Sequence, residues 1–482
     1  MTLIRGPISS RWRGFTMAAG LALAACAPTP PASQPGSPTT ELLPLPEFSA
    51  CAPTTHPTLP AKWQTSALLQ DFFQDALWFG NFVYDEDAGA FRFQLANRYG
   101  AILDYLVTTG GTLYALAGDG ELPSSCAFLT DKSPYTVPPR DLLQAGAECV
   151  GQAPILARNQ QWWKSPSGVG ANWYWFDTTT RLPFRSMFYQ EVAKTSAAPI
   201  YEYFTFDYFP DFREVPATNL AQILAQCRSS QASSQAEAST EYSQLSLAPI
   251  LAKSGYPKVD NATVALAQQW IPGLSECSST GDLPPSWPDQ VQATVFMTAV
   301  SFKPNPFPTR VFYDWTQQAQ NSTLYVYPPN DEELAQVALL LENTGFGIGL
   351  RPDGSVASCE QSLPGPQIPD WNAVDGCQCR AQIAPGTVLN PSDVPTKILW
   401  CPTDLSAKQV FWTWYSNTGT PVVFMQSNSS PTAGTGLNLA DYYHWSPHSV
   451  APEGTFDLPA ACQGTEPIQV PQACHNCHLP LN

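Results

Sequence analysis

Cysteine thiols are the most reactive side chains in this sequence, and their positions divide them into three groups. The chain has 13 cysteines in 482 residues. One cysteine ends a short apolar run near the N-terminus, two stand beside histidines close to the last residue, and the others are spread through the body of the chain. These settings suit three different reactions of a thiol: acylation, attachment of a cofactor, and disulfide formation.

The C-terminal cysteines lie in the segment Cys474-His475-Asn476-Cys477-His478. In a Cys-x-x-Cys-His pattern, two thiols can form thioether bonds to a haem while the histidine binds the iron. The pattern therefore predicts one covalent haem c on Cys474 and Cys477, with His478 as an iron ligand and a redox partner outside the chain. Two alternatives remain open for this tail (463–482): a plain Cys-x-x-Cys disulfide, and a surface metal site on His475 and His478.

The N-terminal cysteine closes the segment Leu23-Ala24-Ala25-Cys26, which resembles the bacterial lipobox. Three arginines and an apolar run over 15–25 precede it, as in a signal peptide, and this run is shorter than the about 20 residues that span a bilayer. We expect residues 1–25 to be removed, Cys26 to carry a lipid, and the proline-rich residues 26–46 to act as a spacer. An ordinary signal peptide, with Cys26 in a disulfide, is the alternative.

Composition restricts the classes of function. The chain has 40 acidic against 23 basic residues, a net charge of −17, and such a surface repels nucleic acid. It contains no glycine-rich phosphate loop, no His-Glu-x-x-His helix and no Gly-x-Ser-x-Gly turn, so we expect no enzymatic activity. Its 48 prolines and 12% aromatic residues favour turn-rich β-structure.

Four blocks of sequence occur twice in the same order. Each set holds, in order, a cysteine with a Leu-Pro-x-x-Trp segment, an Asp-Gly turn before a cysteine, a Trp-rich block, and an aromatic run before a last cysteine. The first set is Cys51 with 59–63, Asp119-Gly120 before Cys126, Trp173 to Phe176, and Tyr201 to Phe204 before Cys227. The second set is Cys277 with 283–287, Asp353-Gly354 before Cys359, Trp412 to Tyr415, and Tyr442 to Trp445 before Cys462. Repeated blocks indicate two diverged copies of one domain. We place these copies at 47–227 and 259–462, joined by a flexible Ser/Gln-rich linker at 228–258.

Apolar runs separated by turn residues predict a mainly β (α+β) fold. In the first copy we expect strands over 77–84, 91–95, 102–107, 112–116, 173–176, 183–189 and 201–209, and in the second over 309–315, 324–327, 409–415 and 421–425. Residues 260–271 and 331–342 have the spacing of short helices. The predicted architecture is two tandem curved antiparallel sheets, each a half-barrel, with a few short helices.

The segment from Trp173 to Arg185, with its Asp177 and Pro183 turn, resembles a hairpin of the lipoprotein-carrier superfamily, which includes the LolA and LolB carriers and ependymin-like proteins. The resemblance covers 51–227 well and 277–462 loosely. It implies a half-barrel with a cavity for an acyl chain or other hydrophobic molecule. Because alternate strand residues share a face, Trp173 and Trp175 would point into this cavity, together with Tyr201 and Tyr203. The alternative is that these aromatic side chains only fill a core.

The duplication also limits the disulfides that we expect. Bonds Cys51–Cys227 and Cys277–Cys462 would tie the ends of each copy together, and Cys126–Cys149 and Cys359–Cys379 occupy equivalent places. Cys377 and Cys401 belong to the second copy alone and would form the fifth bond, Cys377–Cys401. Disulfides of this number indicate a protein that folds outside the cytoplasm.

Three functions remain in competition. We favour an extracytoplasmic, membrane-anchored protein that binds or carries a hydrophobic small molecule or acyl chain. An electron-transfer lipoprotein with haem c is the first alternative, and a structural envelope protein without ligand is the second. Since Ala27 rather than aspartate follows Cys26, the outer membrane is the expected location.

Overall fold

The computed structural model describes most of the two predicted copies. The described residues are 42–71, 76–97, 102–117, 122–133, 137–143, 145–155, 158–167, 170–194, 199–208, 212–234, 274–275, 277, 288–299, 307–326, 331–342, 344–363, 378–385, 396–404, 409–416, 420–428, 436–464 and 468–469. Within these ranges, no helix is both long enough and apolar enough to cross a membrane.

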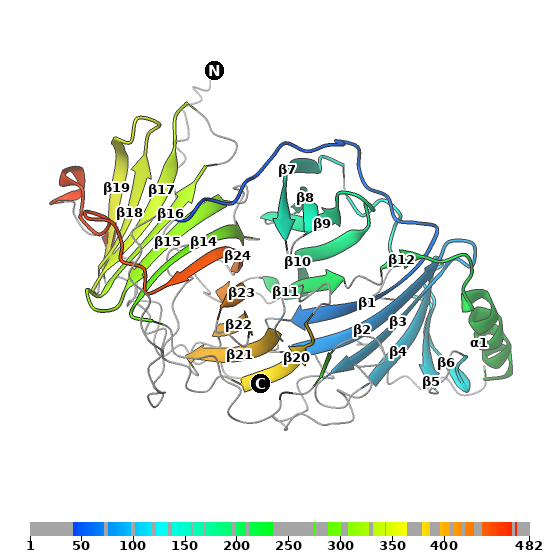
Figure 1. The fold of residues 1–482 in the computed structure, drawn as a ribbon. Helices are drawn as coiled ribbons and strands as arrows, with labels where there is room; N and C mark the ends of the chain where they lie inside the picture. The colour runs from blue at the N-terminus through cyan, green and yellow to red at the C-terminus, as the bar shows by residue number, and fades with distance from the viewer. Residues whose placement is uncertain are drawn as a thin grey trace, which may run out of the picture.

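The first copy forms a 12-stranded antiparallel sheet (Figure 1). Its strands are β1 (Lys62–Asp71), β2 (Ala76–Asp85), β3 (Ala90–Asn97), β4 (Ile102–Thr108), β5 (Leu113–Ala117), β6 (Ser125–Thr130), β7 (Glu148–Ile155), β8 (Arg158–Ser167), β9 (Gly170–Asp177), β10 (Pro183–Lys194), β11 (Pro199–Tyr208) and β12 (Arg213–Glu214). The spatial order is β6-β5-β4-β3-β2-β1-β11-β10-β9-β8-β7, with β12 paired to β1. The helix α1 (Leu220–Ser234) follows the sheet.

The second copy forms a 13-stranded sheet with the same order of neighbours. Its strands are β13 (Leu274–Ser275), β14 (Gln290–Ala299), β15 (Phe307–Asp314), β16 (Ala319–Tyr325), β17 (Ala335–Leu341), β18 (Thr344–Leu350), β19 (Val356–Leu363), β20 (Gln378–Ile383), β21 (Thr396–Asp404), β22 (Gln409–Ser416), β23 (Pro421–Asn428), β24 (Gly436–Pro447) and β25 (Ile468–Gln469). Every strand from β1 to β11 has a counterpart from β14 to β24 with equivalent neighbours. This correspondence is the one that the duplicated sequence blocks predict, and the mainly β fold with two large antiparallel sheets is confirmed.

Two local predictions were wrong. Residues 331–342 do not form a helix, because Ala335–Leu341 is β17, paired on both sides with β16 and β18. Its side chains are buried alternately from Ala335 to Leu339, as in a strand, and its short apolar run cannot be told from a helix by sequence pattern alone. The predicted linker also begins too early, since Arg228 to Ser234 continue α1. The predicted helix over 260–271 lies outside the described residues.

Each face of the first sheet carries its own hydrophobic cluster. One face holds Trp63, Phe82, Tyr84, Phe93 and Tyr105, and Leu59 and Phe212 from flanking segments pack onto them. On the other face, α1 packs its apolar residues against Ala90, Leu106, Tyr114 and Leu116. The apolar residues of α1 in this contact are Leu220, Ile223, Leu224 and Cys227. The aromatic side chains of the first cluster therefore fill a core closed by the protein's own residues.

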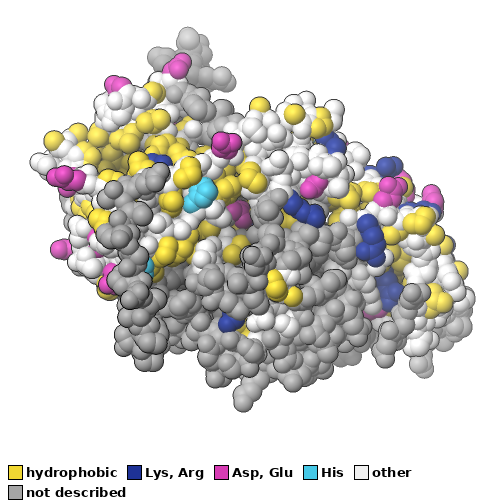
Figure 2. All heavy atoms as spheres, in the orientation of Figure 1, with side chains coloured by type: hydrophobic (Ala, Val, Ile, Leu, Met, Phe, Trp, Pro, Cys, Tyr) yellow, Lys and Arg dark blue, Asp and Glu magenta, His cyan; other side chains and the backbone are white. Residues whose placement is uncertain are grey.

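The second sheet has a comparable cluster that is less fully covered. Val337, Leu339, Phe346 and Ile348 are buried there, while Leu341, Leu350, Val356, Phe456 and Leu458 pack against them partly exposed. Hydrophobic side chains gather on the visible surface over this part of the second sheet (Figure 2). The 3-10 helix η2 (Ala460–Cys462) belongs to the segment that packs on this cluster.

A short extended segment pairs with the same edge strand in each copy. Ser49 forms an antiparallel bridge with Gln152 of β7, and Ser275 of β13 pairs with Gln382 of β20. A cysteine follows two residues after each serine and is bonded to a cysteine three residues before each glutamine. Pairing of this kind satisfies backbone groups that an open sheet edge leaves exposed.

Among the described residues four disulfides are present, and four predicted pairings were wrong. The bonds are Cys51–Cys149, Cys126–Cys227, Cys277–Cys379 and Cys359–Cys462, instead of Cys51–Cys227, Cys126–Cys149, Cys277–Cys462 and Cys359–Cys379. The cysteines of β6 and β7 are close in sequence, but these strands lie at opposite ends of the sheet path, as do β19 and β20. Cys377 lies outside the described residues, so the Cys377–Cys401 bond stays a prediction.

The β2–β3 hairpin and its counterpart, the β15–β16 hairpin, are each closed by a buried aspartate at the same position. Asp85 accepts a hydrogen bond from the Ala88 backbone N–H at 3.1 Å and one from the Thr218 hydroxyl. Asp314 accepts from the Gln317 N–H at 3.2 Å and from the side chains of Thr316, Gln317 and Gln290. Burial acts to raise the pKa of Asp314, but these hydrogen bonds hold the pKa below its ordinary value.

We expect Asp314→Asn to lower the free energy of unfolding by about 1–3 kcal/mol at pH 7, because buried donors lose their charged acceptor. The lowered pKa means that the carboxylate stabilises the fold above the pKa of the unfolded chain. This stabilisation is lost as the pH falls through the folded-state pKa, so the difference between variant and wild type should shrink when the pH is lowered from 7 to 3. Urea unfolding at both pH values checks this, with the exposed Asp353→Asn as a control of small effect. Equal destabilisation by the two substitutions would contradict the hairpin role.

Candidate functional site: the seam between the two sheets

The predicted ligand residues lie on one face of the first sheet. Trp175 is paired with Trp162 of β8 and Arg185 of β10, and Trp173 with Met187. The register from β10 to β11 then places positions 201 and 203 on this same face. The side chains of Tyr201 and Tyr203 are not among the described ones, so only their backbone positions are reported.

This face meets the second sheet through a cluster of aromatic rings. The ring centroid of Trp162 lies 5.4 Å from that of Trp175 and 4.8 Å from that of Phe296 on β14. Phe48, from the segment before β1, lies 4.9 Å from Phe296 and 5.7 Å from Trp162. We call this contact the seam; it lies between strands β8 to β10 of the first sheet and the paired strands β14 and β24 of the second. Phe296, Trp162 and Trp175 are 0% exposed, so the seam is a closed packing surface.

A buried ion pair joins the sheets beside these rings. The Arg185 guanidinium donates to both carboxylate oxygens of Asp441, at 2.9 and 3.1 Å, and the two residues are 2% and 3% exposed. Arg185 also lies 5.7 Å above the ring of Trp175. Asp441 is paired with Phe296 across β14 and β24, which places the ion pair against the aromatic cluster. Charges buried to this extent require such pairing.

Tyr443 adds a further link between the sheets. Its hydroxyl donates a hydrogen bond to the backbone carbonyl of Pro154 at the end of β7. Burial raises the pKa of Tyr443 strongly, the nearby Asp441 carboxylate raises it further, and Arg185 opposes them. The phenol therefore stays neutral and keeps its proton available for donation.

Several polar atoms in the seam have no hydrogen-bond partner within the described part of the chain. They are the indole N–H groups of Trp162 and Trp175, both amide atoms of Gln160, and the hydroxyls of Thr294 and Thr298. All of these side chains are at most 1% exposed. Gln160 precedes Trp162 by two residues on β8, and the threonines flank Phe296 by two residues on β14, so they share faces with the rings. Each unpaired buried group costs about 1–3 kcal/mol of stability.

The residues predicted to carry a lipid or a haem do not belong to the seam. Cys26, Cys474, Cys477 and His478 lie outside the described residues, so lipidation and haem attachment stay predictions. Among the described residues, no cluster of three or more metal-binding side chains occurs. The role of Trp173 and Trp175 as ligand residues also stays a prediction, although both are buried at the seam.

Sequence reasoning missed the partners that the second copy contributes to the seam. Phe296 lies on a strand outside the duplicated blocks, Asp441 precedes one of these blocks, and Arg185 and Asp441 are 256 residues apart. One signal was available: Asp441 is a carboxylate placed directly before the aromatic run Tyr442 to Trp445. A charged residue within an apolar strand indicates either an edge or a buried partner.

Comparisons with known proteins do not identify a family. No protein-family model matches the chain, and no curated protein matches it. The solved structure of MucB in complex with MucA(peri) is 12% identical, covers 81% of this chain and 94% of that one, and has a TM-score of 0.20. Transferrin Binding Protein B from Haemophilus parasuis is 7% identical, with 82% and 77% covered and a TM-score of 0.14. These scores are too low to establish a shared fold, so the family of this chain stays open.

Proposed function

We propose that this chain is a lipid-anchored extracytoplasmic protein that binds an apolar ligand at the seam. The observation that carries the proposal is the composition of the seam. Aromatic rings from both copies surround polar atoms that have no partner among the described residues, including Trp162 and Gln160. Apolar surroundings with a few polar groups are typical of small-molecule sites.

Location outside the cytoplasm is supported by the four disulfides, because such bonds persist in oxidising compartments. The lipobox-like segment ending at Cys26 supports a membrane anchor, and the residue after it favours the outer membrane.

The anchor gives a direct prediction: Cys26→Ser should release the protein from membranes or block its processing. Lipid chains provide attachment at about 0.8 kcal/mol per buried CH₂, while the acidic chain is repelled by anionic headgroups. Fractionation after a high-salt and alkaline wash checks this, with Cys474→Ser as the matched cysteine control. A Cys26→Ser variant that still sediments with membranes would exclude the anchor.

For the ligand, we expect native mass spectrometry of the full chain, purified without detergent, to show a co-bound apolar species. A fluorescent fatty acid should bind, and Phe296→Leu should weaken its binding several-fold because a seam ring is lost. Phe93→Leu makes the same substitution in the cluster on the other face of the first sheet and should leave binding unchanged. If no co-bound species is found and no fatty acid binds, the structural envelope role becomes the better account.

The Cys474–His478 segment favours a second candidate, electron transfer through haem c. An absorption spectrum of the purified protein separates the two: a haem band that persists after denaturation and is lost in Cys477→Ser would support the second candidate. A spectrum without such a band would exclude it.

A further inference from the structure

The segment that precedes the first sheet crosses both sheets before it reaches β1. We call residues 42–56 the strap; it is the dark blue segment at the top of Figure 1. At its start, Arg310 of β15 donates a hydrogen bond to the Leu43 carbonyl at 3.1 Å. In the middle, Phe48 lies between Trp162 of the first sheet and Phe296 of the second. The strap thus contacts the seam on its way from one sheet to the other.

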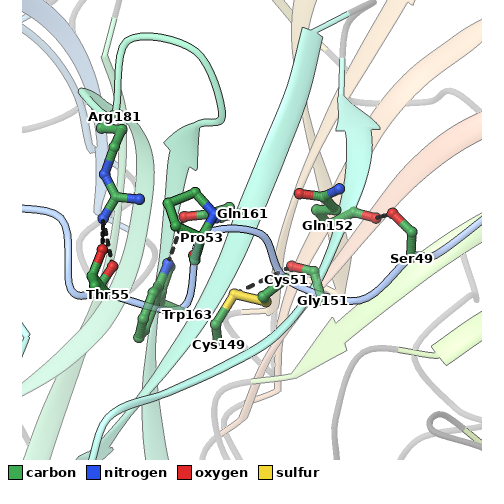
Figure 3. The surroundings of a disulfide bond; sticks show 10 residues. All are labelled: Ser49, Cys51, Pro53, Thr55, Cys149, Gly151, Gln152, Gln161, Trp163 and Arg181. Atoms are coloured by element: carbon green, nitrogen blue, oxygen red, sulfur yellow. Dashed lines mark hydrogen bonds between the residues drawn. A yellow bond between two sulfur atoms is a disulfide. The ribbon is translucent and has the colours of Figure 1, made fainter.

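Beyond Phe48, the strap is firmly attached to the first sheet (Figure 3). Ser49 and Gln152 exchange two backbone hydrogen bonds of 3.0 and 2.8 Å, and Cys51 is bonded to Cys149. Gln161 then donates to the Pro53 carbonyl at 2.8 Å, and Arg181 donates to the Thr55 carbonyl. These contacts hold the part of the strap after Phe48 against the first sheet, and Ser49, the residue next to Phe48, is the first of them.

The place that the Phe48 ring occupies depends on a glycine in β7. A Cβ atom on Gly151 would overlap the Phe48 ring, far inside van der Waals contact. In the second copy, the corresponding pair is Leu274 and Ala381, one residue before Ser275 and one before Gln382. The aromatic side chain and the glycine therefore occur together in the first copy and are both absent from the second.

Two buried side chains on the strand face beside Phe48 have polar atoms without a hydrogen-bond partner among the described residues. Trp162, whose ring Phe48 contacts edge-on, has an indole N–H without a partner, and Gln160 on the same strand face has both amide atoms unpaired. Phenylalanine has no polar atom with which to satisfy them. A molecule with an apolar body and a hydrogen-bond-accepting oxygen would satisfy the donors that Phe48 leaves unpaired.

We propose that Phe48 occupies the place of the ligand, so that the strap is an internal plug and an apolar molecule with an accepting headgroup, such as a fatty acid, displaces it. This inference rests on the proposed function. When the competent, strap-open state is only partly populated, the apparent affinity falls in proportion to its population. Removing the ring should therefore raise affinity.

The test compares the full chain with Phe48→Ala. We expect the variant to bind cis-parinaric acid at least about tenfold more tightly than the wild type, and the gain to be lost in Phe48→Ala/Gln160→Leu. Diphenylhexatriene, which has no accepting oxygen, should gain less. Phe212→Ala removes the same ring from the other face of the first sheet and serves as the control for cavity formation. In the wild type, the fatty acid should also speed hydrogen exchange at the Ser49 N–H.

The outcomes separate this inference from the proposed function. If the wild type binds the fatty acid but Phe48→Ala binds equally or more weakly, the plug is wrong and the binding function stands. If Phe212→Ala gains as much as Phe48→Ala, the effect is an unspecific cavity and the plug is again wrong. If neither wild type nor Phe48→Ala binds either probe, the proposed function itself fails. Unchanged exchange at Ser49 in the presence of bound fatty acid would also overturn the plug.

Discussion

Replacing Arg185 by methionine should lower the free energy of unfolding by about 3–5 kcal/mol, because the substitution leaves the Asp441 carboxylate buried without its cation. The loss should also uncouple the two sheets. We expect urea unfolding, followed by tryptophan fluorescence, to change from one transition to two as the copies begin to unfold separately.

A double substitution separates the cost of the unpaired charge from the value of the pair. Arg185→Met/Asp441→Leu removes both charges and should recover most of the lost stability, since replacing a buried pair by apolar groups is often neutral. Arg92→Met provides a matched control: Arg92 donates to Asp104 at 2.7 Å within the first sheet, and both residues are buried. It should destabilise the first sheet without splitting the transition in the same way. A single unchanged transition in Arg185→Met would contradict the role of the pair in joining the sheets.

Removing the Cys126–Cys227 bond should have an effect of similar size. The bond closes a loop of 101 residues, for which the chain-entropy estimate is about 4.7 kcal/mol. Since Cys51–Cys149 already restrains an overlapping stretch of the unfolded chain, we expect a smaller loss, about 2–4 kcal/mol, for Cys126→Ala/Cys227→Ala. Thermal unfolding without reductant measures this.

Peptide mapping without reduction provides the accompanying control. A proteolytic digest should link the peptide of Cys126 to that of Cys227 and the peptide of Cys51 to that of Cys149. In the double variant only the second link should remain. A link between Cys126 and Cys149 would contradict the interleaved pairing, and a variant as stable as the wild type would show that the bond adds nothing to the fold.

Hairpins were predictable from the sequence because their signals are local. Trp173 to Phe176, the Asp177 turn and Pro183 lie within one short stretch, and the carboxylate of Asp177 accepts hydrogen bonds from the N–H groups of Thr179 and Thr180. Alternation of side chains then fixes which residues share a face. The prediction for residues 331–342 was wrong because a short apolar run such as Ala335 to Leu341 fits a buried strand as well as a helix.

Disulfide pairing and the seam were not predictable because both depend on long-range geometry. Distance along the sequence suggests that Cys126 and Cys149 are neighbours, but β6 and β7 reach opposite ends of the sheet path. The Arg185 position stood out in the hairpin, whereas nothing local indicates that its partner, Asp441, comes from the other copy. The resemblance to lipoprotein carriers drew attention to Trp173 and Trp175, which are buried at the seam, and both their role as ligand residues and the carrier family stay predictions.

The interleaved disulfides have a mechanical consequence. If a chain held at its N-terminal end is pulled, the shortest covalent path through the first copy runs from Cys51 to Cys149, back to Cys126, and across to Cys227. At about 3.4 Å per residue, the stretch from Cys126 to Cys149 allows an extension of roughly 80 Å, against roughly 600 Å for the unbridged stretch from Cys51 to Cys227. The same arrangement recurs with Cys277, Cys359, Cys379 and Cys462. Under tension, each copy can therefore lengthen far less than an unbridged stretch of the same number of residues.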